Sequence, residues 1–117
     1  MHIDRVEVRE SEDSLTLVLG TAAVEVMLIR VRYDGWVDEV VNGAGTVAPG
    51  PGAWTLIGHE LSFDFGVRSA SALGLPRDCR LRLDVDDEGI RRVRAALLEI
   101  LQCACFVLDT PEGRMSS

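Results

Sequence analysis

Apolar and polar residues alternate with period two near the start of the chain, which is typical of half-buried β-strands. In residues 3–9, Val6 and Val8 fall on one side, and in residues 14–19 three leucines do the same. The cluster Glu10-Ser-Glu-Asp13 separates these segments and is predicted to be a turn. The two strands are therefore predicted to form a hairpin.

Residues 23–33 form a longer apolar segment whose alternation changes phase. The apolar positions from Val24 to Leu28 are in step, whereas Ile29 and Val31 occupy the other phase. Such a change indicates either a β-bulge or a central strand that is covered on both faces.

Residues 36–41 are predicted to be a short edge strand. The next segment, 42–52, is rich in glycine and proline and is predicted to hold neither a helix nor a strand ladder. A loop of this length is near the upper end of ordinary connections, so it is expected to be mobile or used for contact.

A second hairpin is predicted at residues 54–65. Gly58-His59 separates its two strands, and glycine is favoured at the first central position of a two-residue type II′ turn. The alternation places Leu61, Phe63 and Phe65 inward, so this hairpin contributes large side chains to the core.

The rest of the chain adds a strand at 80–85 and two helical segments. Residues 68–75 are predicted to be a short helical turn that ends at Gly74 and Pro76. Residues 87–103 are predicted to be an amphipathic helix. Its apolar stripe comprises Ile90, Val93, Leu97, Ile100, Leu101 and Ala104.

These elements predict an α+β fold in a single domain that spans residues 1–109. We expect one antiparallel or mixed β-sheet of about six to seven strands, with the C-terminal helix packed on one face and the short helical turn near 68–75. Residues 110–117 are predicted to be a polar C-terminal tail.

The stretch RLDVDDEG, residues 82–89, has the densest acidic character in the chain. It resembles the start of a calcium-binding loop, but the glutamate needed at the twelfth loop position is replaced by Ala95. We therefore expect Asp86 or Asp87 to cap the following helix and Glu88 to pair with Arg92 one turn on.

The formal net charge of -7 disfavours nucleic acid as a partner, because phosphate binding requires a basic surface. It favours attraction to a basic partner, or it simply keeps the protein in solution. No apolar run approaches the roughly 20 residues of a membrane span, and the N-terminus lacks the apolar core of a signal peptide. We therefore expect a cytoplasmic protein without membrane association.

Cysteine and histidine residues do not complete a recognisable site. Three cysteines, an odd number, favour a reducing compartment and are expected to behave as small apolar residues. Cys103 and Cys105 form a CxC pair, but no second pair of ligands accompanies them. His59 is expected in the hairpin turn. We predict no metal, no cofactor and no catalytic residue.

The order of elements in the second half of the chain resembles that of a known family. The segments concerned are Trp54-Thr-Leu-Ile-Gly-His-Glu-Leu-Ser-Phe-Asp-Phe65, Ser71-Ala-Leu-Gly-Leu75, Leu81-Arg-Leu-Asp-Val85 and Val93-Arg-Ala-Ala-Leu-Leu-Glu-Ile-Leu101. They resemble the tenth family of bacterial polymorphic-toxin immunity proteins, mainly over residues 54–101. Residues 3–19 are similar more loosely, and residues 20–53 depart from the family's pattern.

The resemblance implies a protein that is not an enzyme and that binds a cognate toxin, occluding its active site or substrate groove. Charge and expected exposure suggest the contact residues, because aromatic side chains are enriched at interfaces. These are Asp34, Trp36, Asp38 and Glu39, with Glu60 and Asp64 as secondary candidates. The alternatives are a small ligand-binding or regulatory domain with a pocket between sheet and helix, and a general interaction adaptor. A homodimer is compatible with all three.

Overall fold

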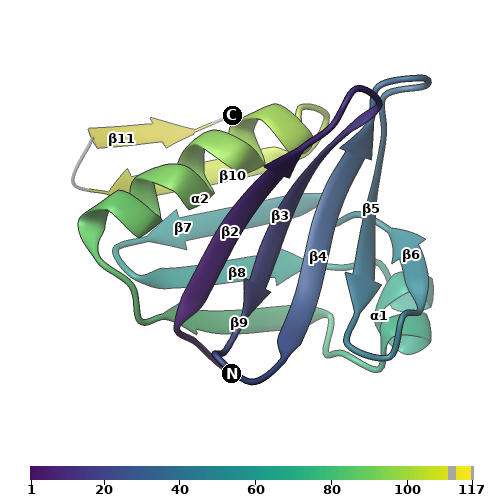
Figure 1. Cartoon of the computed structure of the whole chain (residues 1–117), viewed down its shortest axis with the longest axis horizontal. Helices are drawn as coiled ribbons and strands as arrows, with labels where there is room; N and C mark the ends of the chain where they lie inside the picture. The colour runs from purple at the N-terminus through teal and green to yellow at the C-terminus, as the bar shows by residue number, and fades with distance from the viewer. Residues whose placement is uncertain (111–112, 117) are drawn as a thin grey trace.

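The computed structural model of the chain describes residues 1–110 and 113–116 (Figure 1). The strands of its first half are β1 (His2–Ile3), β2 (Arg5–Glu10), β3 (Ser14–Gly20), β4 (Glu25–Arg32), β5 (Val37–Asn42) and β6 (Val47–Pro49). The second half contains β7 (Ala53–Ile57), β8 (Glu60–Asp64), α1 (Val67–Leu73), β9 (Asp78–Leu83), α2 (Asp87–Ile100), β10 (Cys105–Thr110) and β11 (Gly113–Ser116).

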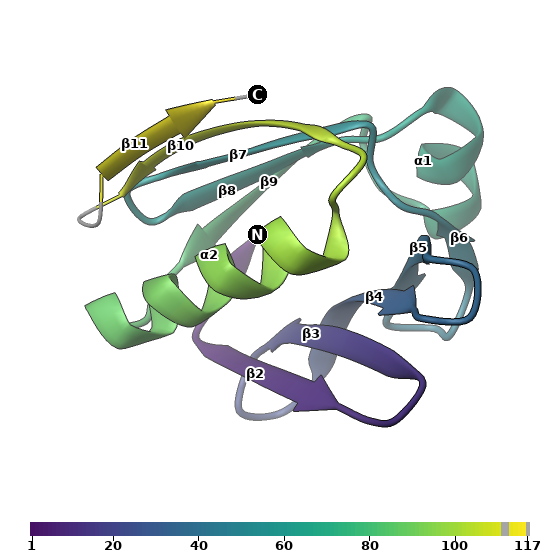
Figure 2. The ribbon, with the colours of Figure 1, turned by 90° about the horizontal axis from the view of Figure 1, so that it is seen from above.

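The strands form two sheets. Sheet A has the order β1-β9-β8-β7-β10-β11, and sheet B has the order β2-β3-β4-β5-β6. Sheet B is antiparallel throughout, whereas sheet A also contains the parallel pairs β1–β9 and β7–β10. Figure 2 shows the sheets facing each other, with α2 between them near β2 and β3.

The fold is α+β, as predicted, but the prediction of one sheet with about six to seven strands is wrong. Period-two alternation identifies the buried face of each strand and carries no information about which strands share a sheet. The helix α2 contacts β2, β3 and β4, so it packs on the inner face of sheet B instead of covering the outside of a single sheet.

The predicted hairpin of β2 and β3 is confirmed, with pairs that run from Arg5↔Gly20 to Glu10↔Leu15. The register between β3 and β4 shifts between Leu19↔Met27 and Gly20↔Glu25. At the predicted change of phase, by contrast, the pairs Val18↔Leu28 and Leu17↔Ile29 follow one another without a bulge. A Cβ atom at Gly20 would lie 2.4 Å from the Val24 carbonyl oxygen, so only glycine allows this close approach. The inward phase of β4 carries Met27, Ile29 and Val31, whereas Val24 is 59% exposed.

Two predictions for the middle of the chain are wrong. The strand β5 lies between β4 and β6, so it is not an edge strand. The segment predicted to hold no ladder contains β6, which pairs with β5 at Val47↔Val41. Asn42 organises this connection: its side-chain oxygen accepts from the Ala44 and Thr46 amides, and its amide group donates to the Leu73 carbonyl at 2.9 Å.

The second predicted hairpin and the short helix are confirmed. Gly58 has φ 59° and His59 does not have a positive φ, which agrees with a type II′ turn. The helix α1 ends at Gly74, whose left-handed conformation lets its N–H reach the carbonyl groups of Ala70 and Ser71.

The predicted amphipathic helix is also present, but α2 ends at Ile100 rather than at residue 103. Leu101 and Ala104 are nevertheless buried beyond its end. The chain then returns as β10, which pairs in parallel with β7, and Leu108 enters the core. The segment predicted to be a polar tail contributes β11, which pairs antiparallel with β10 and has four exposed residues.

One hydrophobic core joins both sheets and both helices. Trp54, Phe63 and Phe65 are among its largest fully buried side chains. Nowhere in residues 1–110 or 113–116 is there a helix with the length and apolar character to cross a membrane.

Candidate functional site

The acidic stretch before α2 forms a helix start, as predicted. The Asp86 carboxylate accepts a hydrogen bond from the Gly89 amide at 2.9 Å, which satisfies a free N–H of the first turn. Glu88 pairs with Arg91 at 2.6 Å and with Arg92 at 3.7 Å. Across the described residues, no three His, Cys, Asp or Glu side chains are grouped so that they could hold a metal ion.

The predicted contact residues are divided between the two sheets. Asp34 and Trp36 lie in the turn between β4 and β5, and Asp38 and Glu39 lie within β5 of sheet B. Glu60 and Asp64 begin and end β8 of sheet A, with side chains on the outer face of that sheet. The six residues therefore do not form one surface.

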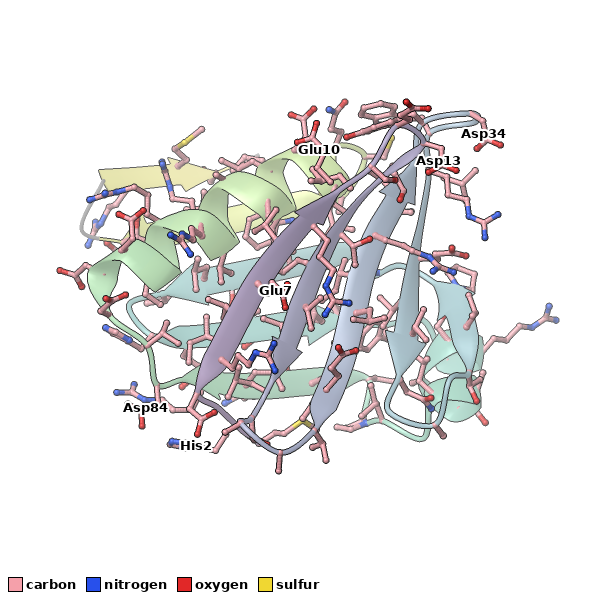
Figure 3. The ribbon with its side chains drawn as sticks, in the orientation of Figure 1. His2, Glu7, Glu10, Asp13, Asp34 and Asp84 are labelled. Carbon is pink, nitrogen blue, oxygen red and sulfur yellow. The ribbon has the colours of Figure 1, made fainter. Side chains whose placement is uncertain are left out.

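Two turns lie side by side at one end of sheet B and bring carboxylates together. The Tyr33 amide of the β4–β5 turn donates to the Asp13 carbonyl of the β2–β3 turn at 2.9 Å. Figure 3 shows Glu10, Asp13 and Asp34 at this end of the molecule. We call this surface the acidic end. It comprises Glu10, Glu12, Asp13, Tyr33, Asp34 and Trp36.

An aromatic pair lies at the acidic end. The Trp36 ring stacks on the Tyr33 ring, with centroids 5.4 Å apart and an interplanar angle of 24°. Trp36 is 39% exposed, and among the described residues it is the one non-glycine residue with a positive φ, 52°. A bulky residue in this conformation is strained, and such strain is concentrated at functional sites.

Most carboxylates of the acidic end lack a partner within the protein. No hydrogen bond or ion pair from a described residue reaches the side chains of Glu10, Glu12 or Asp34. Asp13 accepts a hydrogen bond from the Ser11 hydroxyl at 2.8 Å. This end of sheet B therefore carries carboxylates without a direct partner, although Arg30 and Arg32 line the same hollow as Asp13 and Asp34.

The pKa of the Tyr33 hydroxyl group is raised at the acidic end. Partial burial raises its pKa, and the nearby carboxylates of Glu10 and Glu99 raise the pKa further. Because Glu99 lies on α2, the last turns of this helix adjoin the acidic end.

Two of the predicted contact residues, Asp38 and Glu39, are partly buried in β5. Glu39 forms ion pairs with Arg30 and, at 3.3 Å, with Arg32, and its side chain is only 17% exposed. Asp38 points to the inner phase of β5, and a Cβ atom at Gly50 would lie 3.0 Å from its carboxylate. Burial raises the pKa of Asp38. Glu39 therefore already has two cationic partners, whereas Asp38 is half-buried without one.

Sequence reasoning missed part of the acidic end. Glu10, Glu12 and Asp13 were recognised only as a turn, because such clusters are the ordinary composition of a hairpin connection. The signal that could have found them is the pairing of β2, β3 and β4 as consecutive antiparallel strands. Such a meander places alternate turns at the same end of a sheet.

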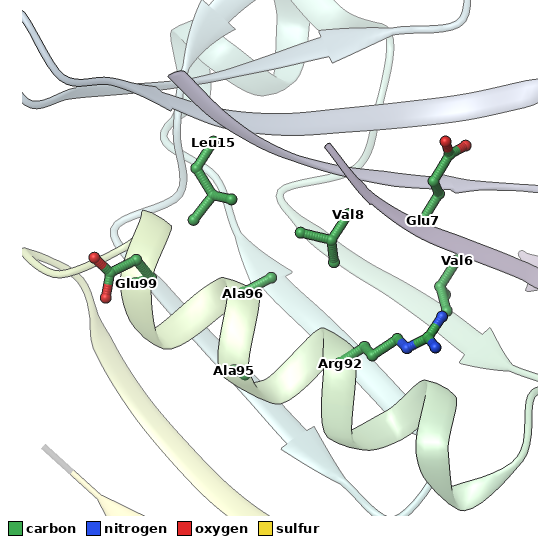
Figure 4. A pocket seen from close by; sticks show the side chains of 8 residues that line it. All are labelled: Val6, Glu7, Val8, Leu15, Arg92, Ala95, Ala96 and Glu99. Carbon is green, nitrogen blue, oxygen red and sulfur yellow. The ribbon is translucent and has the colours of Figure 1, made fainter. Parts of the chain in front are cut away.

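A groove of about 600 Å³ lies between the edge strand β2 and the helix α2 (Figure 4). Its lining is mostly apolar, with charged side chains at its margins. It comprises Val6, Glu7, Val8, Leu15, Arg92, Ala95, Ala96 and Glu99. Glu7 is already engaged by Arg5 and Arg9, and the hydrogen bond from Arg9 lowers its pKa.

The cysteines fall into two groups. Cys79 is buried, which raises the pKa of its thiol and agrees with a small apolar role. Cys103 and Cys105 are exposed, so the prediction that they are buried apolar residues is wrong. The helix ends before Cys103, and the outward phase of β10 exposes Cys105. His59 lies in the hairpin turn, with Nδ1 2.9 Å from the Leu83 carbonyl oxygen.

Comparisons with protein-family models, with curated proteins and with solved structures find no match for this chain. The resemblance to an immunity-protein family therefore stays a prediction.

Proposed function

We propose that this protein binds a cognate bacterial toxin through the acidic end and inhibits it by occluding its active site or substrate groove. The resemblance of residues 54–101 to polymorphic-toxin immunity proteins supports the choice of a toxin as the partner. The proposal describes an inhibitor that acts by binding and not by chemistry.

One observation carries the proposal: the turn that holds the exposed, stacked Trp36 adjoins the β2–β3 turn, and carboxylates on these two turns have no partner among the described residues. Tryptophan is enriched among residues that dominate binding energy, because it buries a large rigid surface on contact. Uncompensated carboxylates at the same place attract a basic surface, which speeds association and orients the partner. A basic toxin, such as one whose substrate is itself an anion, fits both features.

Co-expression with the product of the gene immediately upstream tests the proposal. We expect this protein to restore growth of cells that express the upstream gene product, and we expect the two proteins to co-purify. If cells die as fast with this protein as without it, and no complex is recovered, the proposal is wrong.

A pair of matched double variants tests the surface itself. Glu12→Lys with Asp34→Lys reverses two exposed carboxylates of the acidic end, and we expect it to abolish protection. Glu60→Lys with Asp64→Lys makes the same change in net charge on the outer face of sheet A. The second variant is expected to protect normally. Equal loss in both variants would show that net charge matters and that the acidic end does not.

A small-ligand-binding domain is the second candidate, and the groove between β2 and α2 favours it. Its volume of about 600 Å³ is within the range of small-molecule sites, and its lining is mostly apolar, as in such sites. A domain of this kind would leave the toxicity of the upstream gene product unchanged.

A further inference from the structure

The strand β2 presents the longest open edge of the two sheets. It has six residues, compared with two in β1, three in β6 and four in β11. Beyond β3, no described strand pairs with it, so alternate N–H and C=O groups of β2 have no strand partner and point sideways from the edge of sheet B. Val8 belongs to the inner phase of β2 and is nevertheless 40% exposed, because it lines the open groove between β2 and α2.

The helix α2 continues this open edge in the second layer. Ala95 and Ala96 form the middle of its groove-facing surface, and small residues allow a second helix to approach closely. Arg92 and Glu99 lie one turn on either side of the alanines, so the surface carries opposite charges at equal distances from its centre. A surface of this pattern is complementary to itself when it is rotated by 180°.

We propose that the groove is filled by a second copy of this chain, in a two-fold symmetric dimer that pairs β2 with β2 and α2 with α2. Both pairs run antiparallel. Sheet B then continues from one copy into the other as a ten-stranded sheet, and Arg92 of each copy faces Glu99 of the second copy. The interface is isologous, as in most dimers.

The sequence of β2 selects the register of this pairing. The valines of both copies stay on the inner face only when even-numbered residues of one β2 pair with even-numbered residues of the other. A two-fold axis at Glu7 would oppose Glu7 to itself and Arg5 to Arg9, which repels. An axis at Val8 opposes Glu7 to Arg9 of the second copy. It keeps residues 6–10 of both strands paired, with Val6 opposite Glu10 at the two ends of the ladder.

The spacing of the two layers agrees with this arrangement. The helix α2 crosses sheet B obliquely and contacts β2, β3 and β4, so its axis passes beneath the space between β2 and β3 at one point (Figure 1). Strands in a sheet are roughly 4.8 Å apart, which places the two helices about 10 Å from each other across the two-fold axis. Packed helices are about 8–10 Å apart. The two spacings are therefore compatible where the helices cross.

The groove surface of α2 is complementary to itself, and this favours a second copy of the chain as its occupant. A segment of another protein would bind without needing Arg92 and Glu99 at equal distances from the centre of the surface. The groove borders the acidic end at Glu10 and Glu99, whereas Glu12 and Asp34 lie on the turns outside it. The inference rests on the open edge and the charge pattern and does not use the proposed function. Glu12→Lys with Asp34→Lys is expected to leave the dimer intact.

Sedimentation velocity on the full chain, from low micromolar to millimolar concentration, tests the dimer. We expect Arg92→Glu and Glu99→Arg each to weaken dimerisation at least tenfold, because each places like charges across the axis. The double variant with both changes restores opposite charges and is expected to recover dimerisation. Arg80→Glu, on the outer face of sheet A, is the control and is expected to dimerise normally.

Hydrogen exchange provides a second measurement that does not depend on the variants. We expect β2 amides to become more protected as the protein concentration rises, while those of β11 do not. A chain that remains monomeric at every concentration overturns the proposal. So does a dimer that both single variants leave unchanged, or one that the double variant fails to restore.

Discussion

Two acidic regions of this protein have similar compositions and opposite relations to the fold. Before α2, the Asp84 carboxylate lies 3.2 Å from Nε2 of His2. Asp86 caps the helix, and Glu88 pairs with Arg91 and Arg92. At the acidic end, Glu12 and Asp34 have no partner among the described residues. The first region stabilises the protein, and the second leaves charge available to another molecule.

The difference teaches that the density of acidic residues does not locate a binding surface. The stretch before α2 is the more acidic of the two in sequence, yet its charges are used within the chain. A carboxylate that already accepts a hydrogen bond or an ion pair has less to gain from a partner.

Removing the exposed tryptophan should have the largest effect on binding. We expect Trp36→Ala to weaken the complex with the toxin by about 30-fold, since a buried tryptophan at the centre of an interface is typically worth about 2 kcal/mol or more. Asp86→Ala should leave the affinity unchanged. Titration calorimetry with the purified toxin domain measures both. Equal affinities for Trp36→Ala and the wild type would remove the acidic end from the interface.

The free energy of unfolding should depend more on the acidic stretch before α2 than on the acidic end. We expect Asp86→Ala to lower the free energy of unfolding by about 1 kcal/mol, because the Gly89 amide loses its capping acceptor. Asp34→Ala removes an exposed carboxylate without a partner, so its effect should stay within about 0.5 kcal/mol. Urea unfolding of both variants measures the difference, and similar losses in the two variants would contradict the contrast.

The strained backbone of Trp36 should have a smaller effect, on the free energy of unfolding. Trp36→Gly and Trp36→Ala both remove the indole ring, but only glycine adopts a φ of 52° without strain. We expect Trp36→Gly to be more stable than Trp36→Ala by roughly 0.5–1 kcal/mol. A less stable glycine variant in thermal unfolding would show that the turn relaxes when the ring is lost.

Asp38 lies between the two extremes, because it is half-buried without a cationic partner. Burial raises its pKa above the value in the unfolded chain, so the folded protein binds this proton more tightly. Ionised Asp38 therefore lowers stability at neutral pH, and Asp38→Asn should raise it by less than about 1 kcal/mol.

The pH dependence of this effect gives the check. The gain from Asp38→Asn should be complete above the folded-state pKa and should vanish as the pH falls below about 3.9, the ordinary pKa of aspartate. Thermal unfolding from neutral to acidic pH measures it. A gain that persists unchanged at low pH would assign the effect to packing.

Several elements could be predicted because their signals are local. The cap at Asp86, the type II′ turn at Gly58 and the end of α1 at Gly74 each depend on residues within one turn. The inward phase of Leu61, Phe63 and Phe65 also followed from alternation, and all three side chains are fully buried.

The strand β6 and the adjacency of the acidic turns could not be predicted in this way. Val47–Pro49 has weak strand character and is ordered by pairing with β5. Asn42 supports this arrangement by accepting from the Thr46 amide just before β6 and donating to the Leu73 carbonyl of α1. The neighbour of Asp34 is Asp13, far away in the chain, which no local pattern records.

The sequence by itself determined the buried faces of β3 and β8, the start of α2 and the total charge, because these depend on neighbours along the chain. Only the tertiary structure decided that the strands divide into two sheets, that α2 lies between them and that Glu10, Asp13 and Asp34 share one end. The physical reason is that alternation specifies how a strand is buried but not against what. Partner choice among strands is settled by packing over the whole core.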